Sequence, residues 1–153
     1  MPKSPEQLPE SKISLYKPIR PMLAERVRTV QEALERIGPV AAAEYKLDGE
    51  RVQIHKGEGK CKVELFSRRL ENITHNYPDI IKEVSNSIKV KEVIIEGEVV
   101  RIDPQTSEFL PFQELMHRRR KHKVEETMES YPVVVNIFDV LFVDKTSLPY
   151  SNK

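Results

Sequence analysis

Residues 44–51 (EYKLDGER) bring together an amine, several carboxylates and a guanidinium group. In an extended chain Lys46 and Asp48 project to the same side, because side chains alternate with a period of two. Gly49 lets the backbone turn with a positive φ or approach a ligand closely. The segment can therefore hold a nucleophilic lysine beside a carboxylate and Arg51. The alternative is an ordinary turn, since Lys-Leu-Asp-Gly at a strand end is common turn chemistry.

Two glutamates, Glu96 and Glu98, interrupt a run that is otherwise made of Val and Ile. At i and i+2 of a strand they lie on one face, roughly 7 Å apart. Burying such a pair without a counter-charge is costly, so we expect a cation beside them. Gly97, between them, leaves space for a close approach. The alternative is an edge strand that keeps both glutamates in water.

Two further segments carry groups that suit a nucleotide. Arg68 and Arg69 follow an expected strand, and a guanidinium matches the oxygens of a phosphate. Phe138 offers a ring on which a purine can stack, and Asp139, in so apolar a run, must find a polar partner. Each also has an ordinary interpretation, because exposed arginines are usually solvated and strand phenylalanines usually belong to the core.

Apolar periodicity predicts the elements that position these residues. A helix is expected over 29–37, capped by Thr29 and ended by Gly38-Pro39, with further helical segments over 78–88, 108–116 and 124–128. Strands are expected over 40–45, 51–55, 62–67, 93–102 and 133–143.

The expected strands are joined mostly by short turns. The turn at 57–59 predicts that strands 51–55 and 62–67 form a hairpin. Strand 93–102 is apolar on both faces apart from a few charges, as expected of a central strand. Strands outnumber helices, which indicates an α+β fold with a mainly antiparallel sheet and flanking helices. Residues 1–16 are polar, contain three prolines and are expected to be a disordered lead-in.

Composition limits the classes of function that remain. The 153 residues suffice for one core, and 25 basic against 24 acidic residues give a net charge of +1. Bulk attraction to nucleic acid is therefore excluded, and a basic surface would need a local cluster such as residues 117–123. Cys61 is the sole cysteine, which fits a reducing compartment, and no apolar run can span a bilayer. We expect a soluble, cytoplasmic protein.

Four motifs, KLDGER, FSRR, EGEVV and NIFDVLFVD, occur in an order and spacing that resemble the covalent nucleotidyltransferases, which include DNA ligases, RNA ligases and mRNA capping enzymes. RPMLAE at 20–25 is similar to DNA ligases in particular. SRRLENIT and FQELMHRRRK look most like the archaeal branch of the ATP-dependent DNA ligases. The resemblance implies that residues 17–153 form the adenylation domain of such an enzyme, with an ATP-grasp-like fold.

The resemblance also implies roles for single residues. Lys46 would attack the α-phosphate of ATP and become covalently attached to AMP, supported by Asp48 and Gly49. Glu98 would bind a metal ion or the ribose. The remaining positions would bind the nucleotide: Glu44 at adenine, Arg51 at the sugar, Arg68 at sugar or phosphate, and Phe138 stacked on the base.

The implied activity has three steps: AMP passes from ATP to Lys46, then to the 5′-phosphate of a DNA nick, and a 3′-hydroxyl finally displaces it and seals the strand. At neutral pH an ordinary lysine amine is protonated, and forming the neutral amine costs about 4–5 kcal/mol. Nearby cations favour the neutral form, so we expect Mg²⁺ or Mn²⁺ to be required. Such enzymes act in DNA replication, repair and recombination, at the nucleoid, and the sequence leaves open whether a sliding clamp recruits the parent protein.

The chain also departs from the family pattern. The paired lysines that follow the last strand in the family are not found before Lys153, and neither an oligonucleotide-binding fold nor a separate DNA-binding domain is expected here. The sequence is thus expected to be a fragment with impaired ligation. The alternatives are a non-catalytic nucleotide- or DNA-binding remnant, an RNA ligase and a capping-type enzyme.

Overall fold

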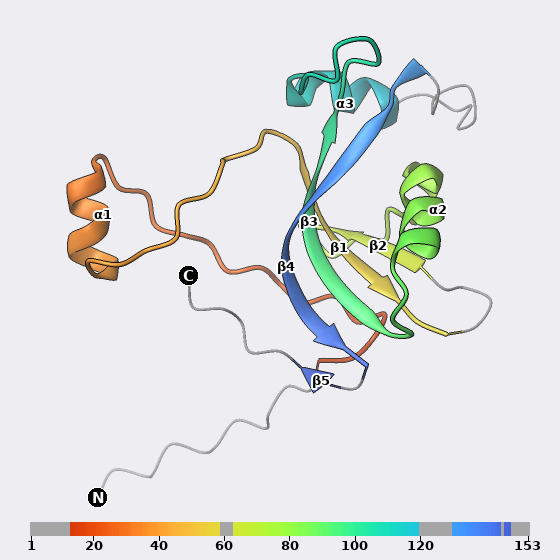
Figure 1. Ribbon diagram of the computed structural model, residues 1–153, viewed down its shortest axis with the longest axis horizontal. Coiled ribbons are helices and arrows are strands. Elements are labelled where there is room, and N and C mark those ends of the chain that lie inside the picture. The colour runs from red at the N-terminus through yellow and green to blue at the C-terminus, as the bar shows by residue number, and fades with distance from the viewer. Residues whose placement is uncertain (1–12, 59–62, 120–129, 145, 148–153) are drawn as a thin grey trace, which may run out of the picture.

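A five-stranded sheet in the order β2-β1-β3-β4-β5 forms the centre of the protein (Figure 1). The computed structural model describes residues 13–58, 63–119, 130–144 and 146–147. Every pairing in the sheet is antiparallel, which confirms the predicted α+β class. The elements are α1 (Val30–Ile37), β1 (Glu50–Lys56), β2 (Val63–Ser67), the 3₁₀ helix η1 (Thr74–Asn76), α2 (Pro78–Ser87), β3 (Val93–Arg101), α3 (Phe112–Arg119), β4 (Val133–Val143) and β5 (Thr146–Ser147).

Strand β3 is central, with β1 on one side and β4 on the other. The expectation from its apolar sequence is therefore confirmed, and the edge-strand alternative for Glu96 and Glu98 is wrong. The predicted hairpin is also confirmed, because β1 and β2 pair from Val52↔Ser67 to Lys56↔Val63. The predicted strand 133–143 has the same bounds as β4.

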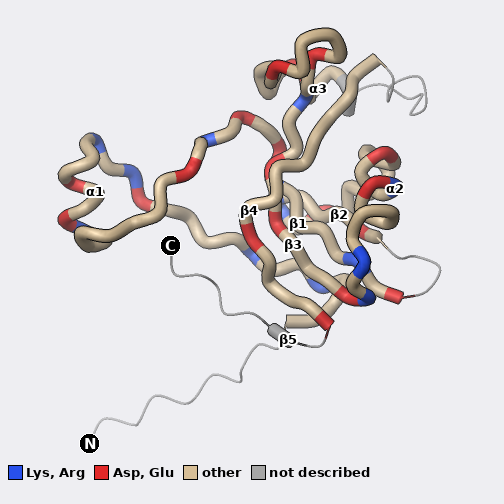
Figure 2. The backbone as a smooth tube through the Cα atoms, in the orientation of Figure 1, with Lys and Arg blue, Asp and Glu red and all other residues tan. Residues whose placement is uncertain are grey.

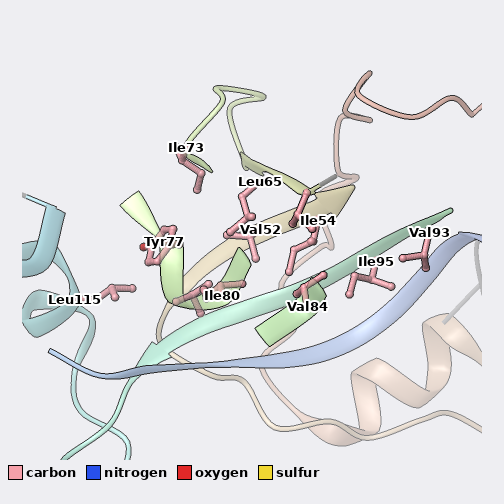
Figure 3. Packing of buried hydrophobic residues seen from close by; sticks show 12 residues of the cluster. Val52, Ile54, Leu65, Ile73, Tyr77, Ile80, Val84, Val93, Ile95 and Leu115 are labelled. Carbon is pink, nitrogen blue, oxygen red and sulfur yellow. The ribbon is translucent and has the colours of Figure 1, made fainter. Parts of the chain in front are cut away.

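One face of the sheet carries the main hydrophobic core, beneath α2 (Figure 3). Alternate residues of β1 and β3 point into it, and α2 adds Ile80 and Val84. Tyr77, which precedes α2, is fully buried, and its hydroxyl donates a hydrogen bond to Glu50 Oε2 at 2.6 Å. The core side chains shown together are Val52, Ile54, Leu65, Ile73, Tyr77, Ile80, Val84, Val93, Ile95 and Leu115.

Helix α1 stands away from the sheet, at the end of two extended segments (Figure 1). Its predicted boundaries are confirmed: Thr29 Oγ1 accepts from Glu32 N at 3.1 Å, and Gly38, at φ 104°, ends the helix. Its apolar residues are nevertheless uncovered in the described part of the chain, with Val30 78% and Ile37 60% exposed. Within the same ranges, none of the helices has the length and apolar character needed to cross a membrane.

Three expected elements differ from the structure. The strand expected over 40–45 is wrong, because this segment is exposed, irregular and pairs with no described strand. The helix expected over 108–116 begins only at Phe112, since Pro111 keeps the preceding residue out of the helical region and Phe109 instead forms a bridge with Ile102. The helix expected over 124–128 lies outside the described residues.

Residues 13–19, which we call the N-terminal strap, cross the face of the sheet opposite α2. Ile13, Leu15 and Ile19 pack there against a second apolar cluster made of Ile94, Leu141 and Phe142. Residues 1–12 lie outside the described ranges. Residues 13–16, which the sequence assigned to the disordered lead-in, belong to the packed part of the chain because their apolar side chains find this cluster.

Polar contacts also hold the strap to the sheet. Tyr16 N donates to His55 Nδ1 at 2.9 Å, so the neutral ring carries its proton on Nε2, which lies 2.9 Å from Gln53 Oε1. The imidazole is fully buried against the Tyr16 and Phe66 rings. Burial lowers the pKa of His55 to about 4. A protonated ring would also lose its acceptor for Tyr16 N.

A matched pair of leucine variants tests the position of the core. Leu65→Ala should lower the free energy of unfolding by about 2–5 kcal/mol, because it opens a cavity at a fully buried site. Leu23→Ala, at a leucine that is 75% exposed, should change it by less than about 0.5 kcal/mol. Chemical denaturation measures both. Equal losses in the two variants would contradict the assigned core.

The buried imidazole also predicts a dependence of stability on pH. Between the ordinary pKa of 6.5 and the folded-state pKa of about 4 for His55, the unfolded chain binds more protons, so stability is lost as the pH falls through this window. The loss attributable to His55 is about 3 kcal/mol. In His55→Gln the fall between pH 6.5 and 4 should be shallower by this amount. His75→Gln, at an exposed histidine, should keep the wild-type slope. Parallel slopes in all three proteins would refute the assignment.

Candidate functional site

A cleft of about 1310 Å³ lies on the sheet face opposite α2, beyond the strap. Its walls are the two extended segments that lead to and from α1, at residues 21–26 and 44–47, and the turn at 67–69. Arg51, Glu98 and Phe138 from the sheet also line it. Every residue predicted to react with or bind the nucleotide lines this cleft: Glu44, Lys46, Arg51, Arg68, Glu98 and Phe138.

Arg51, Glu98 and Phe138, which line the cleft, come from the three neighbouring strands β1, β3 and β4. Arg51 of β1 is paired with Glu98 of β3, which is paired in turn with Asn136 of β4, so the three side chains share one face. The register of β3 and β4 shifts between Glu96 and Gly97, and Phe138 is the extra residue. This irregularity puts the Phe138 ring beneath Arg51, whose Cζ lies 5.1 Å from the ring centroid.

The buried carboxylate of Glu96 is paired with a cation, the guanidinium group of Arg51. The carboxylate is 2% exposed and accepts a hydrogen bond from Arg51 Nη2 at 2.5 Å. Its other oxygen accepts from Gln53 Nε2 at 3.0 Å. A buried carboxylate is stable only when paired and hydrogen-bonded in this way. Arg51 is therefore a fixed part of the sheet as well as a lining residue of the cleft.

Glu98 faces the cleft and is half-buried. Its Oε1 accepts a hydrogen bond from Gly49 N at 3.2 Å. Burial raises the pKa of Glu98, while the Gly49 bond and the charges of Lys46 and Arg51 oppose that rise. The charge of Lys46 is thus close enough to act on this carboxylate.

Lys46 lies in the irregular segment before β1 rather than at a strand end. Its side chain is exposed, and Nζ donates to the carbonyl oxygen of Leu47 at 2.9 Å. Asp48, which the sequence grouped with Lys46, is turned to another partner: its Oδ2 accepts from Phe112 N, the first residue of α3, at 3.3 Å. Asp48 therefore caps α3 and ties the lysine segment to it.

Gly49 is needed for close packing and not for a positive φ. A Cβ at this position would lie 2.1 Å from the carbonyl oxygen of Val99 and 3.0 Å from Glu98 Cγ. Among the described glycines only Gly38 has a positive φ. The positive φ offered by the sequence analysis is therefore wrong for Gly49, and the close approach that the structure shows is to the backbone of β3.

The sequence did not indicate a role for two polar residues on the same sheet face, next to those that line the cleft. Gln53 and Asn136 are polar residues within apolar strands, and this was the only signal available for them. Gln53 is 4% exposed and joins Glu96 to the strap. Asn136 has a buried side-chain nitrogen without a hydrogen-bond partner among the described residues.

The antiparallel sheet and its cleft define a domain of the nucleotidyltransferase type. The chain belongs to the family of the ATP-dependent DNA ligase domain, whose model matches residues 21–152. It is 55% identical over 141 residues to the DNA ligase of Pyrobaculum calidifontis. The aligned region covers 92% of this chain and 24% of that protein. The chain therefore spans about a quarter of the length of this relative.

Two solved structures have the same fold. The ligase domain of LigD from M. tuberculosis is 25% identical, with a TM-score of 0.53, and the match covers 69% of this chain and 30% of that one. A mycobacterial DNA ligase D complexed with ATP and MES gives a TM-score of 0.51 at the same identity and coverage. Both support the predicted nucleotidyltransferase fold.

The close approach at Gly49 generates a prediction. Gly49→Ala should lower the free energy of unfolding by about 1–3 kcal/mol, because the added methyl group overlaps the backbone of β3. Gly57→Ala is the matched control: its Cβ would meet mainly the hydroxyl end of the flexible Tyr16 side chain, so we expect a smaller loss. Denaturant titration measures both, and a larger loss at Gly57 would contradict the geometry.

Proposed function

We propose that this chain is the adenylation part of an ATP-dependent DNA ligase, in which Lys46 takes AMP from ATP. One observation carries the proposal: Lys46 lines the same cleft as Arg51, Arg68, Glu98 and Phe138. Membership of the DNA ligase family and the likeness to a ligase complexed with ATP support it. We assign the adenylation domain to residues 17–153, together with the strap residues 13–16 that pack on it.

The nucleotide would occupy the cleft with its phosphates toward Lys46. Phe138 supplies a ring for the base, and Glu44, on the cleft wall, suits recognition of adenine. Arg51 and Arg68 are placed to contact sugar or phosphate oxygens, which match the guanidinium fork.

In the transfer step Lys46 Nζ, once it has lost its proton, forms a bond to the α-phosphorus of ATP. The bond between that phosphorus and the bridging oxygen breaks, and pyrophosphate leaves. The exposed position of Lys46 lets its amine reach a nucleotide held against Arg51 and Glu98. AMP would then pass to the 5′-phosphate of nicked DNA, and a 3′-hydroxyl would displace it to seal the strand.

The cleft also fits a divalent metal ion. The described residues contain no cluster of three or more His, Cys, Asp or Glu that could hold one by themselves. Mg²⁺, however, is commonly bound by one or two carboxylates together with substrate phosphates and water, and the half-buried Glu98 meets that need. Mg²⁺ or Mn²⁺ held there would neutralise charge on the phosphates and the leaving pyrophosphate.

The wider setting follows from the same family. We infer that the parent protein seals nicks in DNA during replication, repair and recombination, in the cytoplasm at the nucleoid, and that its origin is archaeal, as its similarity to the Pyrobaculum enzyme suggests. Acidic and basic positions are interspersed along the described chain (Figure 2), so DNA contact would depend on local groups and not on net charge. An RNA ligase or capping enzyme is not favoured, because the matching family model is that of a DNA ligase domain.

Labelling with radioactive ATP tests the central step. With ATP and Mg²⁺ the wild-type chain should gain the mass of one AMP in an acid-labile bond, and Lys46→Ala should gain none. Lys89→Ala is the matched control, because Lys89 is also exposed and also donates to a nearby backbone carbonyl. It should be labelled like the wild type. Labelling of Lys46→Ala would exclude Lys46 as the nucleophile, and ATP binding by the wild type without an adduct would favour the non-catalytic remnant.

A further inference from the structure

Gln53 occupies an unusual position for a polar side chain. It lies on β1 between the core residues Val52 and Ile54, two residues from Arg51, and is 4% exposed. Because side chains alternate along a strand, Gln53 points to the same face as Arg51, the face of the cleft and the strap. A buried amide must satisfy both its oxygen and its nitrogen, so its partners show what it holds in place.

The oxygen of Gln53 binds the strap. Gln53 Oε1 accepts from Ile19 N at 2.8 Å and lies 2.9 Å from His55 Nε2. His55 in turn accepts from Tyr16 N. Two points of the strap are thus tied to the same stretch of β1, and the strap continues directly into the cleft wall at residues 21–26.

The nitrogen of Gln53 binds the strap and the cleft floor together. Gln53 Nε2 donates to the carbonyl oxygen of Ile19 at 3.3 Å and to Glu96 Oε1 at 3.0 Å. Glu96 holds Arg51 through its second oxygen. An unbroken line of hydrogen bonds therefore runs from the strap through Gln53 and Glu96 to the guanidinium group at the cleft.

The orientation of the Arg51 side chain depends on this chain of hydrogen bonds. Its Nη2 atom is bound to Glu96, and its guanidinium lies over Phe138, but its buried Nε has no hydrogen-bond partner among the described residues. Rotation of the Glu96 carboxylate would therefore move the guanidinium. Gln53 opposes that rotation because it binds Glu96 Oε1, the carboxylate oxygen that Arg51 does not bind.

We propose that Gln53 is a positioning residue for nucleotide transfer, which fixes Glu96 against the strap and thereby orients Arg51 in the cleft. The inference deepens the proposed function, on which its kinetic consequence rests. Gln53 itself touches no substrate in this scheme and acts through the ion pair of Glu96 and Arg51.

The kinetic test compares Gln53→Met with the wild type in the labelling reaction. Met fills a similar volume without the amide, so Arg51 should lose its orientation and the KM for ATP should rise about ten-fold, with a smaller change in kcat. In an Arg51→Lys background, Gln53→Met should add no further effect, because the group that it positions is already gone. A KM equal to the wild-type value, or fully additive effects, would overturn the proposal.

Two further variants separate positioning from general damage to the fold. Gln53→Glu keeps an acceptor for Ile19 N but removes the amide donor to Glu96 and to the carbonyl oxygen of Ile19. It also places a like charge beside Glu96, so it should displace that carboxylate and reproduce the rise in KM even if Gln53→Met is poorly folded. Gln31→Met is the control, because Gln31 lies on the exposed surface of α1 and binds only Glu35 among the contacts described. It should leave KM unchanged. A rise in KM in the control equal to that in Gln53→Met would overturn the proposal.

A spectroscopic test does not depend on activity. Side-chain ¹⁵N resonances of Arg51, identified by their loss in Arg51→Lys, should show restricted rotation of the guanidinium in the wild type and faster rotation in Gln53→Met, which removes the amide without adding a charge. Unchanged rotation would exclude the positioning role. If the wild-type chain were never labelled by ATP, the proposed function would fail, and this measurement would still decide the role of Gln53.

Discussion

The negative charge of Glu96 is the constraint around which the rest of the site is arranged. It sits on the central strand, almost without exposure, where a carboxylate is stable only beside a cation. Arg51 supplies that cation from the neighbouring strand, so a residue that faces the cleft is also one that the fold requires. The need to neutralise a buried group thus places a guanidinium at the cleft, before any ligand arrives.

The two faces of the sheet carry different kinds of side chain. The face beneath α2 is covered by hydrophobic side chains, whereas the opposite face carries Arg51, Gln53, His55, Glu96 and Glu98 in neighbouring rows. The strap covers one end of this polar face and leaves the other open as the cleft. Because strand residues alternate strictly, the polar face can carry these groups without disturbing the core on the other side.

Much of the fold followed from local patterns in the sequence. The capped helix α1, the hairpin of β1 and β2, the central strand β3 and the bounds of β4 all depend on short-range periodicity and turn chemistry, which the sequence displays directly. One error was local, because Pro111 delays the start of α3. The other errors arose where contacts between distant parts of the chain determine the structure. Among the described residues no strand pairs with residues 40–45, and residues 13–16 pack on an apolar cluster formed by strands that lie far away in the chain. The gathering of Lys46, Glu98 and Phe138 around one cleft agrees with what the motifs implied, but the partners of Asp48 and Gln53 could not be foreseen, because no pattern in the sequence encodes a bond across 64 or 43 positions.

The cap that Asp48 provides for α3 has a mechanical consequence. A single carboxylate, two residues after Lys46, holds the first amide of a helix that begins 64 positions later. The segment that carries Lys46 and the N-terminus of α3 are therefore joined directly by one hydrogen bond and not only through the sheet between them. Loss of this hydrogen bond would leave the first amide of α3 without its cap.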